Sequence, residues 1–155
     1  MAITSDFDMN AMRNQFAAFV DEIERKQIER LQMLGEKCVI EARNNRGYMM
    51  QTGALSSSTG YMIFKDGVAL HDEFTAADGA SADGGSRGMQ AGKGVAEQVG
   101  SQTTGICLVV VAGMNYALHV ESKGYNVLAS AEKLAESELP KMLQRLIGDI
   151  KRAAE

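Results

Sequence analysis

The sequence contains no tryptophan, one proline, two histidines and two cysteines among its 155 residues. Neither Cys38 nor Cys107 has a second cysteine at C-x-x-C spacing, and only His71 and His119 could complete a set of metal ligands. We therefore expect no structural zinc site. Aromatic residues make up 6% of the chain, whereas there are ten methionines. Methionine side chains are flexible, so they are typical of adaptable cores and of interfaces that rearrange.

The chain also has no excess of positive charge and no long apolar run. Its net charge of −4 lacks the basic surface that binding to a nucleic-acid backbone requires. The longest apolar run, residues 106–112, is too short to span a bilayer. The first ten residues, MAITSDFDMN, include acids and no apolar segment typical of a signal peptide. We expect a cytosolic chain with no membrane partner and no specific nucleic-acid partner.

The length, with 45% hydrophobic and 23% charged residues, is typical of a single domain, here residues 1–155. Residues 1–46 are predicted to be helical, with Gly35 as a candidate kink. The apolar residues of this region recur at helical spacing: Met12, Phe16, Phe19, Ile23, Leu31, Leu34 and Cys38. This stripe fits either a core or a neighbouring subunit.

Residues 52–74 predict a β-hairpin that follows a turn at Gly53. Two apolar runs, 60–64 and 68–74, flank Lys65-Asp66-Gly67. Asp-Gly between apolar runs favours a type I′ turn, in which both central residues need positive φ.

Residues 75–105 hold eight of the sixteen glycines and are predicted to be a flexible loop, either functional or ordered only on binding. Residues 106–128 then form a strand and a junction. The β-branched run at 106–112 predicts a central strand buried on both faces.

The junction segment GMNYALHVESKG, residues 113–124, fits two structures. As a strand it would turn Tyr116, Leu118 and Val120 inward, and as a helical turn it would place Tyr116, Ala117 and Val120 on one face. We favour the helical turn.

Residues 129–155 predict a C-terminal helix packed on the sheet, with Ser130 as a candidate N-cap. Pro140 either kinks this helix or begins a new one. The predicted fold class is α+β: a long N-terminal helix, a small and mostly antiparallel sheet with a β-hairpin, a long glycine-rich loop and a C-terminal helix.

Three chemical sites can be drawn from the sequence, and each has a simpler explanation. Residues 88–94, GMQAGKG, lack the first glycine and the final Ser/Thr of a phosphate-binding Walker A loop, so we expect a mobile loop. Cys107 with His119 and Asn115 or Glu121 would make a thiol hydrolase, yet Cys107 lies in an apolar strand, where a thiol is inert. Cys38 lies on the apolar stripe of the first helix.

His119 and Glu121 could also act as an acid–base pair, or His119 with His71 as metal ligands. We interpret them instead as exposed polar residues of a strand or turn. Ser56, Ser57 and Ser58 have no paired base in the sequence.

Two segments together resemble the phage neck and minor tail-component family, which includes tail-completion and head–tail joining proteins. The first is Thr52-Gly53-Ala54-Leu55, followed by Gly60-Tyr61; the second is Asn115-Tyr116-Ala117, followed by Val120-Glu121 and Gly124. The resemblance spans most of the chain, because a leading and a trailing helix enclose both segments. The chain departs from the family pattern at Ser56, where an arginine is usual, at the spacing from Glu121 to Gly124, and at residues 126–131, which replace a proline-rich stretch.

The resemblance implies a structural virion protein with no catalytic residue and no cofactor, assembled in the cytoplasm of the bacterial host. It would form a ring, expected to be a hexamer, and dock on other neck, portal-side or tail-tube proteins; whether it completes the tail, terminates it or adapts the head stays open. The implied structural or interface residues are Gly53, Leu55, Tyr61, Asn115, Tyr116, Glu121 and Gly124. Two alternatives remain: a small phage-encoded hydrolase that uses Cys107 or His119, and a monomeric peptide-binding module.

Overall fold

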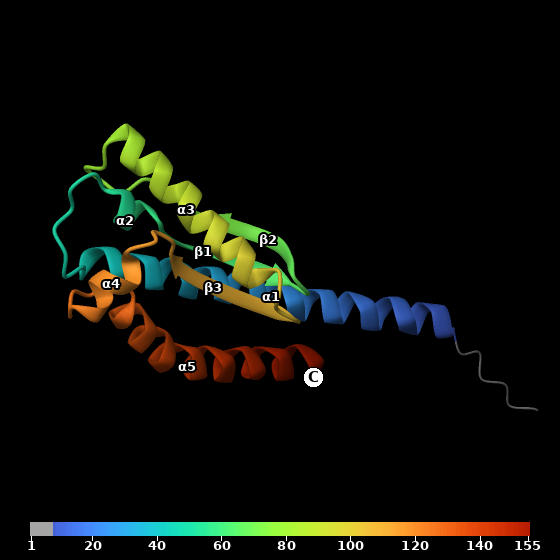
Figure 1. The fold of residues 1–155 in the computed structure, drawn as a ribbon. Helices are drawn as coiled ribbons and strands as arrows, with labels where there is room; N and C mark the ends of the chain where they lie inside the picture. Colours follow the sequence, from blue (N-terminus) through green and yellow to red (C-terminus); the bar gives the residue numbers. More distant parts are fainter. Residues whose placement is uncertain (1–7) are drawn as a thin grey trace, which may run out of the picture.

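The computed structural model describes residues 8–155 and has the predicted α+β fold class (Figure 1). Residues 1–7 of the predicted helical region 1–46 lie outside the described residues. The elements follow in the order α1 (Met9–Asn44), α2 (Ala54–Ser57), β1 (Thr59–Lys65), β2 (Val68–Glu73), α3 (Ala82–Gly100), β3 (Ile106–Ala112), α4 (Ala117–Ser122) and α5 (Ala129–Ala154).

The N-terminal helix α1 is one uninterrupted helix of 36 residues, about 54 Å long at 1.5 Å per residue. The Asp8 carboxylate caps it by accepting from the backbone N–H groups of Asn10 and Ala11 at 3.0 and 3.2 Å. The helix runs through Gly35 without a break. Glycine is needed there because a Cβ would lie 2.6 Å from the Tyr61 ring. Gly35 therefore marks a packing contact between α1 and the sheet.

The three strands form an antiparallel sheet in the order β2-β1-β3. The type I′ prediction for the hairpin is confirmed in its main requirement, because Asp66 and Gly67 have φ values of 51° and 81°. The prediction that residues 106–112 form the central strand is wrong, because β1 is central and β3 lies at an edge. Helices cover both faces of β3, so its sequence is apolar throughout although one of its edges is open.

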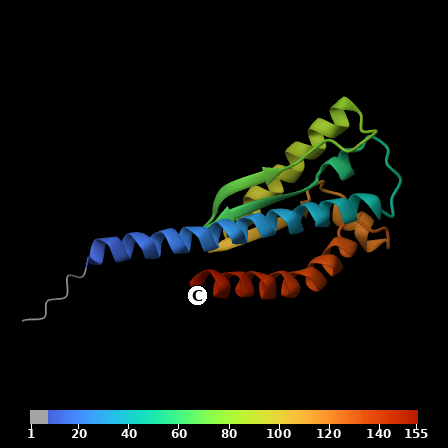
Figure 2. The same ribbon diagram turned by 180° about the vertical axis from the view of Figure 1, so that it is seen from behind.

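The sheet lies between two helical layers (Figures 1 and 2). On one face, Met62 and Phe64 of β1 pack with Val109 and Val111 of β3 and with Ala96 of α3. On the other face, α1 and α5 enclose a second cluster with β3. Its members are Leu34, Cys38, Ala42, Leu108, Val110, Leu128, Ala131, Ala135 and Met142. The C-terminal helix thus packs on the sheet as predicted, in company with α1.

The prediction of a flexible loop over residues 75–105 is wrong, because α3 occupies most of it. Ser81 begins the helix by accepting from the Gly84 N–H at 3.0 Å. Small residues recur at every fourth position and are buried: Gly84, Gly88, Gly92, Ala96 and Gly100. A Cβ on Gly88 would lie 2.2 Å from the Ala54 carbonyl oxygen. The glycines therefore form the face through which α3 approaches the backbone of α2 and β1.

The last two helices settle three predictions. The segment 113–124 forms a helical turn, α4, as favoured above. Ser130 is not the N-cap of α5, which begins at Ala129 after Leu128. Pro140 lies inside α5, which does not restart there, and the helix bends along its length in both views (Figures 1 and 2), as expected of a helix that contains a proline.

Candidate functional site

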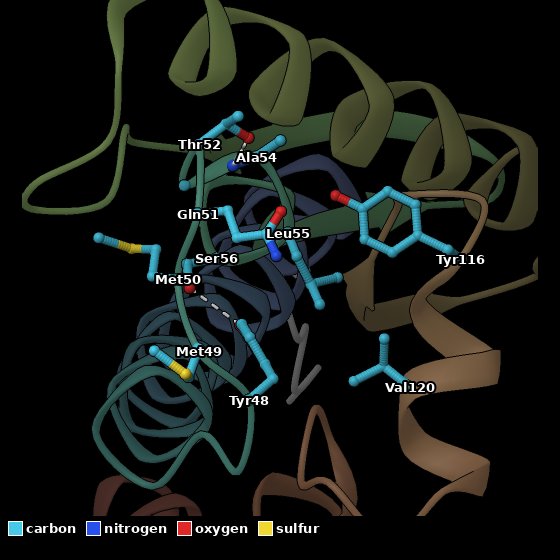
Figure 3. A pocket seen from close by; sticks show the side chains of 11 residues that line it. Tyr48, Met49, Met50, Gln51, Thr52, Ala54, Leu55, Ser56, Tyr116 and Val120 are labelled. Carbon is cyan, nitrogen blue, oxygen red and sulfur yellow. Dashed lines mark hydrogen bonds between the residues drawn. The ribbon is translucent and has the colours of Figure 1, made fainter.

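The two segments that carry the family resemblance meet at one pocket of about 210 Å³ (Figure 3). The chain from Tyr48 to Ser56 forms one side, and Tyr116 and Val120 form the other. We call it the junction pocket. Its lining residues are Tyr48, Met49, Met50, Gln51, Thr52, Gly53, Ala54, Leu55, Ser56, Tyr116 and Val120.

Gly53 sets the path of the chain at this pocket. Its φ of +79° lies in the left-handed region, which glycine adopts without strain. A Cβ at this position would also lie 2.3 Å from the Ala80 Cβ. The predicted turn at Gly53 is confirmed, and the turn leads into the short helix α2, which carries the buried Leu55.

A hydrogen bond joins the two ends of the Tyr48–Ser56 segment. The Tyr48 hydroxyl lies 2.9 Å from the Ser56 Oγ (Figure 3). Burial raises the pKa of Tyr48, an effect that its bond to Ser56 partly offsets. Ser56, Ser57 and Ser58 are almost completely buried. Each of their hydroxyls is hydrogen-bonded within the chain: Ser56 Oγ to the Tyr48 hydroxyl, Ser57 Oγ to the Ala77 N–H, and Ser58 Oγ to the Leu55 carbonyl oxygen.

Arg43 supports the same segment from α1. Its guanidinium donates to the carbonyl oxygens of Ser56, Thr59 and Thr75 at 3.1, 3.1 and 2.6 Å. Burial lowers the pKa of Arg43. Sequence reasoning missed both Arg43 and Tyr48, because they follow no motif: only the fold brings Tyr48 to the pocket and the Arg43 guanidinium to the Ser56 carbonyl oxygen.

The junction pocket is uncharged and lined by both polar and apolar side chains. Its lining has no Asp, Glu, His, Lys or Arg side chain. Tyr116 is 40% exposed, and Met49, on the other side of the pocket, is 91% exposed (Figure 3). Large, partly exposed tyrosine and methionine side chains are enriched at protein–protein interfaces.

Glu121 lies outside the pocket and fixes the start of α5. Its carboxylate accepts from the backbone N–H groups of Val127, Leu128 and Ala129 at 2.5, 3.1 and 2.7 Å. These groups have no partner within the helix, so a side-chain carboxylate satisfies them and complements the helix dipole. Gly124, with φ +87°, turns the chain between the two elements. Glu121 therefore links α4 to the start of α5.

The structure separates the other implied interface residues. Asn115 is exposed just before α4. Tyr61 is fully buried on β1, away from the pocket, and its hydroxyl lies 3.3 Å from His71 Nε2 and donates to Glu36 Oε1 at 3.5 Å. Burial, with the nearby carboxylates of Glu36 and Glu73, raises the pKa of Tyr61 to about 12. Tyr61 is thus a core residue of the sheet.

The residues of the hydrolase alternative are not brought together. Cys107 lies near the start of β3, and His119 lies on α4 beyond the other end of that strand. The strand from Cys107 to Ala112 alone spans about 17 Å at 3.3 Å per residue. Cys38 is buried, and burial raises the pKa of its thiol. Residues 88–94 lie within α3, where the predicted mobile loop does not exist.

Comparison with known proteins returned no match among protein-family models, curated proteins or solved structures. Between residues 8 and 155, no helix is both long and apolar enough to cross a membrane. No group of three or more His, Cys, Asp or Glu residues within the same range could hold a metal ion.

Proposed function

We propose that this chain is a structural protein of a phage virion, of the head–tail connector or tail-completion type. It acts by association: copies form a ring, expected to be a hexamer, which docks on neighbouring neck, portal-side or tail-tube proteins. The observation that carries the proposal is the convergence of Thr52–Leu55 and Tyr116–Val120, about sixty residues apart in sequence, on the junction pocket.

The size of the pocket favours an inserted side chain over a small-molecule ligand. Its volume of about 210 Å³ exceeds the roughly 150 Å³ that holds benzene in an engineered cavity. It falls below the roughly 300–1,000 Å³ of typical ligand sites. An apolar or aromatic residue of a neighbouring virion protein would fill it, with Met49 and Tyr116 making contacts at the rim.

The primary test is electron microscopy of a lysate from the parent phage with this gene deleted. Full heads separate from tails, or tails of aberrant length, are expected. Normal infectious particles would overturn the proposal. In that case the purified protein would be screened for hydrolase activity with Cys107→Ala and His119→Ala variants as controls.

Complementation of that deletion tests the junction pocket itself. Tyr116→Asp, which places a charge in the uncharged pocket, should fail to restore infectivity although the protein still folds. Leu118→Asp is the matched control, because Leu118 lies on α4, is 81% exposed and does not line the pocket. Equal complementation by the two variants would remove the pocket from the docking surface.

A further inference from the structure

Two apolar surfaces of the chain remain uncovered at the end of the molecule opposite the junction pocket. The first is the N-terminal part of α1, which continues past the sheet and past the end of α5 (Figures 1 and 2). The second is a groove of about 460 Å³ between α1, β3 and α5. We propose that the projecting part of α1 in one copy binds in this groove of the next copy, which makes a head-to-tail contact. The choice of a second copy as the occupant rests on the proposed ring function.

The projecting segment carries a narrow apolar stripe. Its members, spaced alternately three and four residues apart, are Met9, Met12, Phe16, Phe19 and Ile23. This spacing keeps side chains on one face of a helix and is typical of a helix that packs against a partner. Phe16, at the middle of the stripe, is 70% exposed. An aromatic side chain this exposed, in line with four other apolar residues, is typical of an interaction surface.

The groove has the shape and composition to receive a helix. Apolar side chains of three elements line it, among them Leu31, Ile106, Leu108, Leu139, Leu143 and Leu146. Leu143 is 44% exposed and Leu139 is 38% exposed, whereas Leu146 is buried. The stripe from Met9 to Ile23 is about 21 Å long, and the α5 wall from Ala135 to Leu146 is about 17 Å long, at 1.5 Å per residue. The two surfaces therefore match in length.

The two surfaces lie near charges of opposite sign. Residues 8–24 hold four acids, Asp8, Asp21, Glu22 and Glu24, and one base, Arg13. Two of these acids form ion pairs within the chain, Glu22 with Arg25 and Glu24 with Lys65. A separate hollow on the other side of α5, which shares Arg30 with the groove, is lined by four bases and one acid: Arg30, Lys141, Arg145, Arg152 and Asp149. In the described part of the chain, neither Lys141 nor Arg145 forms an ion pair, whereas Arg30 and Arg152 share Asp149. The basic end of α5 would attract the acidic N-terminal part of α1 as it approaches the groove.

The same charges argue against the simplest alternative, in which two α1 stripes pair with each other. That symmetric contact would bring two acidic segments together and leave both grooves empty. A head-to-tail contact covers both surfaces of every copy at once. Such a heterologous contact generates a ring when its rotation closes, which fits the proposed assembly.

Two single substitutions and their mixture test this contact. Phe16→Asp disables the stripe, and Leu143→Asp disables the groove. Each variant should be a monomer of about 16.7 kDa at concentrations where the wild type associates, measured by native mass spectrometry and sedimentation. Loss of one buried large apolar side chain alone weakens an association about 10- to 100-fold. An equimolar mixture retains one intact stripe and one intact groove, so it should form a 1:1 complex and nothing larger.

Matched controls place the same charge off the contact. Asn14→Asp lies two residues from Phe16 on the opposite side of α1, and Ser137→Asp lies on an exposed part of α5. Both should associate as the wild type does. Arg145→Glu changes a charge without altering the apolar lining of the groove. This variant should weaken association about 2- to 5-fold at low salt. Far-UV circular dichroism confirms that each variant is folded.

Three results would overturn the inference. The first is a monomeric wild type at the highest concentration, and the second is normal association of Phe16→Asp. The third is normal association of Leu143→Asp together with a monomeric Phe16→Asp, which would indicate stripe-to-stripe pairing. The gene-deletion experiment does not depend on these masses, so this inference and the proposed function can fail separately.

Discussion

Replacing glycine by alanine should have opposite effects at two positions of the same helix. In a helix interior, alanine is favoured over glycine by about 1 kcal/mol. Gly94 of α3 is exposed, and a Cβ there would meet no atom within 4 Å. Gly94→Ala should therefore stabilise the protein by about 1 kcal/mol and raise Tm by about 2–4 °C for a chain of this length.

At Gly88 the same change should destabilise. The added Cβ would lie 2.2 Å from the Ala54 carbonyl oxygen and 2.8 Å from the Ser57 Cβ. The nearest obstacle is backbone, which cannot rotate away, so the overpacking cost lies near the upper end of the usual range, about 3 kcal/mol. After the gain of about 1 kcal/mol in helix propensity, the net loss is about 2 kcal/mol. Tm should fall by about 4–8 °C.

Thermal unfolding followed by circular dichroism at 222 nm measures both variants. All samples need the same protein concentration, because self-association would shift Tm by mass action. A rise in Tm for Gly88→Ala equal to that for Gly94→Ala would refute the reasoning, since it would mean that α3 does not approach α2 through its glycines.

Three further changes test other contacts of the fold. Glu121→Ala removes three hydrogen bonds to backbone N–H groups and should destabilise by about 2 kcal/mol, whereas Glu132→Ala, in the exposed first turn of α5, should cost about 0.5 kcal/mol by chemical denaturation. In a spectrophotometric titration, one of the four tyrosines should ionise near pH 12, and this ionisation step should be absent from the Tyr61→Phe variant. Because the folded state favours the neutral phenol, the contribution of Tyr61 to stability is complete below pH 10 and is lost as the pH rises toward 12. In Cys107→Ser, the buried Cys38 thiol, whose pKa burial raises, should react with a disulfide reagent only as fast as the protein opens, so labelling as fast as that of a free thiol would contradict the packing.

The hairpin turn and the two long helices could be predicted because neighbouring residues alone determine them. Asp66-Gly67 specifies its turn by backbone conformation alone, and the helical spacing of α1 and α5 follows from the period of the helix. The edge position of β3 is different. Its apolar sequence indicates that both faces of the strand are covered. The sequence of a strand does not indicate which strands pair with it, so the edge position could not be predicted.

The glycines of α3 were interpreted as flexibility although their spacing held the contrary signal. Residues 84, 88, 92, 96 and 100 are all Gly or Ala, and a period of four places them on one face of a helix. Low helix propensity is outweighed there by packing, because only a surface without side chains lets two backbones approach so closely. A period of four among small residues therefore predicts a closely packed helix.

The candidate site was predictable only in part. Gly53, Leu55 and Tyr116 were singled out from their motifs, but the pocket that joins them depends on how α2 and α4 pack. Glu121 was singled out from its motif as well, whereas its function as a cap depends on where α5 begins. Tyr61 was grouped with these residues because it follows the first motif closely. In the sheet, its side chain points to α1, and it is part of the core.

The two proposed contact surfaces are separate in the fold, and this makes their roles distinguishable. The junction pocket lies beside α2 and α4, whereas the stripe projects from the other end of α1 (Figure 1). A ring protein that also docks on other rings needs both a contact between copies and a contact with its neighbours, and surfaces at opposite ends can serve both at once. Phe16→Asp should therefore abolish association of the purified chain, whereas Tyr116→Asp should leave it intact and block only the joining of heads to tails. Loss of association in Tyr116→Asp would instead mean that the pocket belongs to the contact between copies.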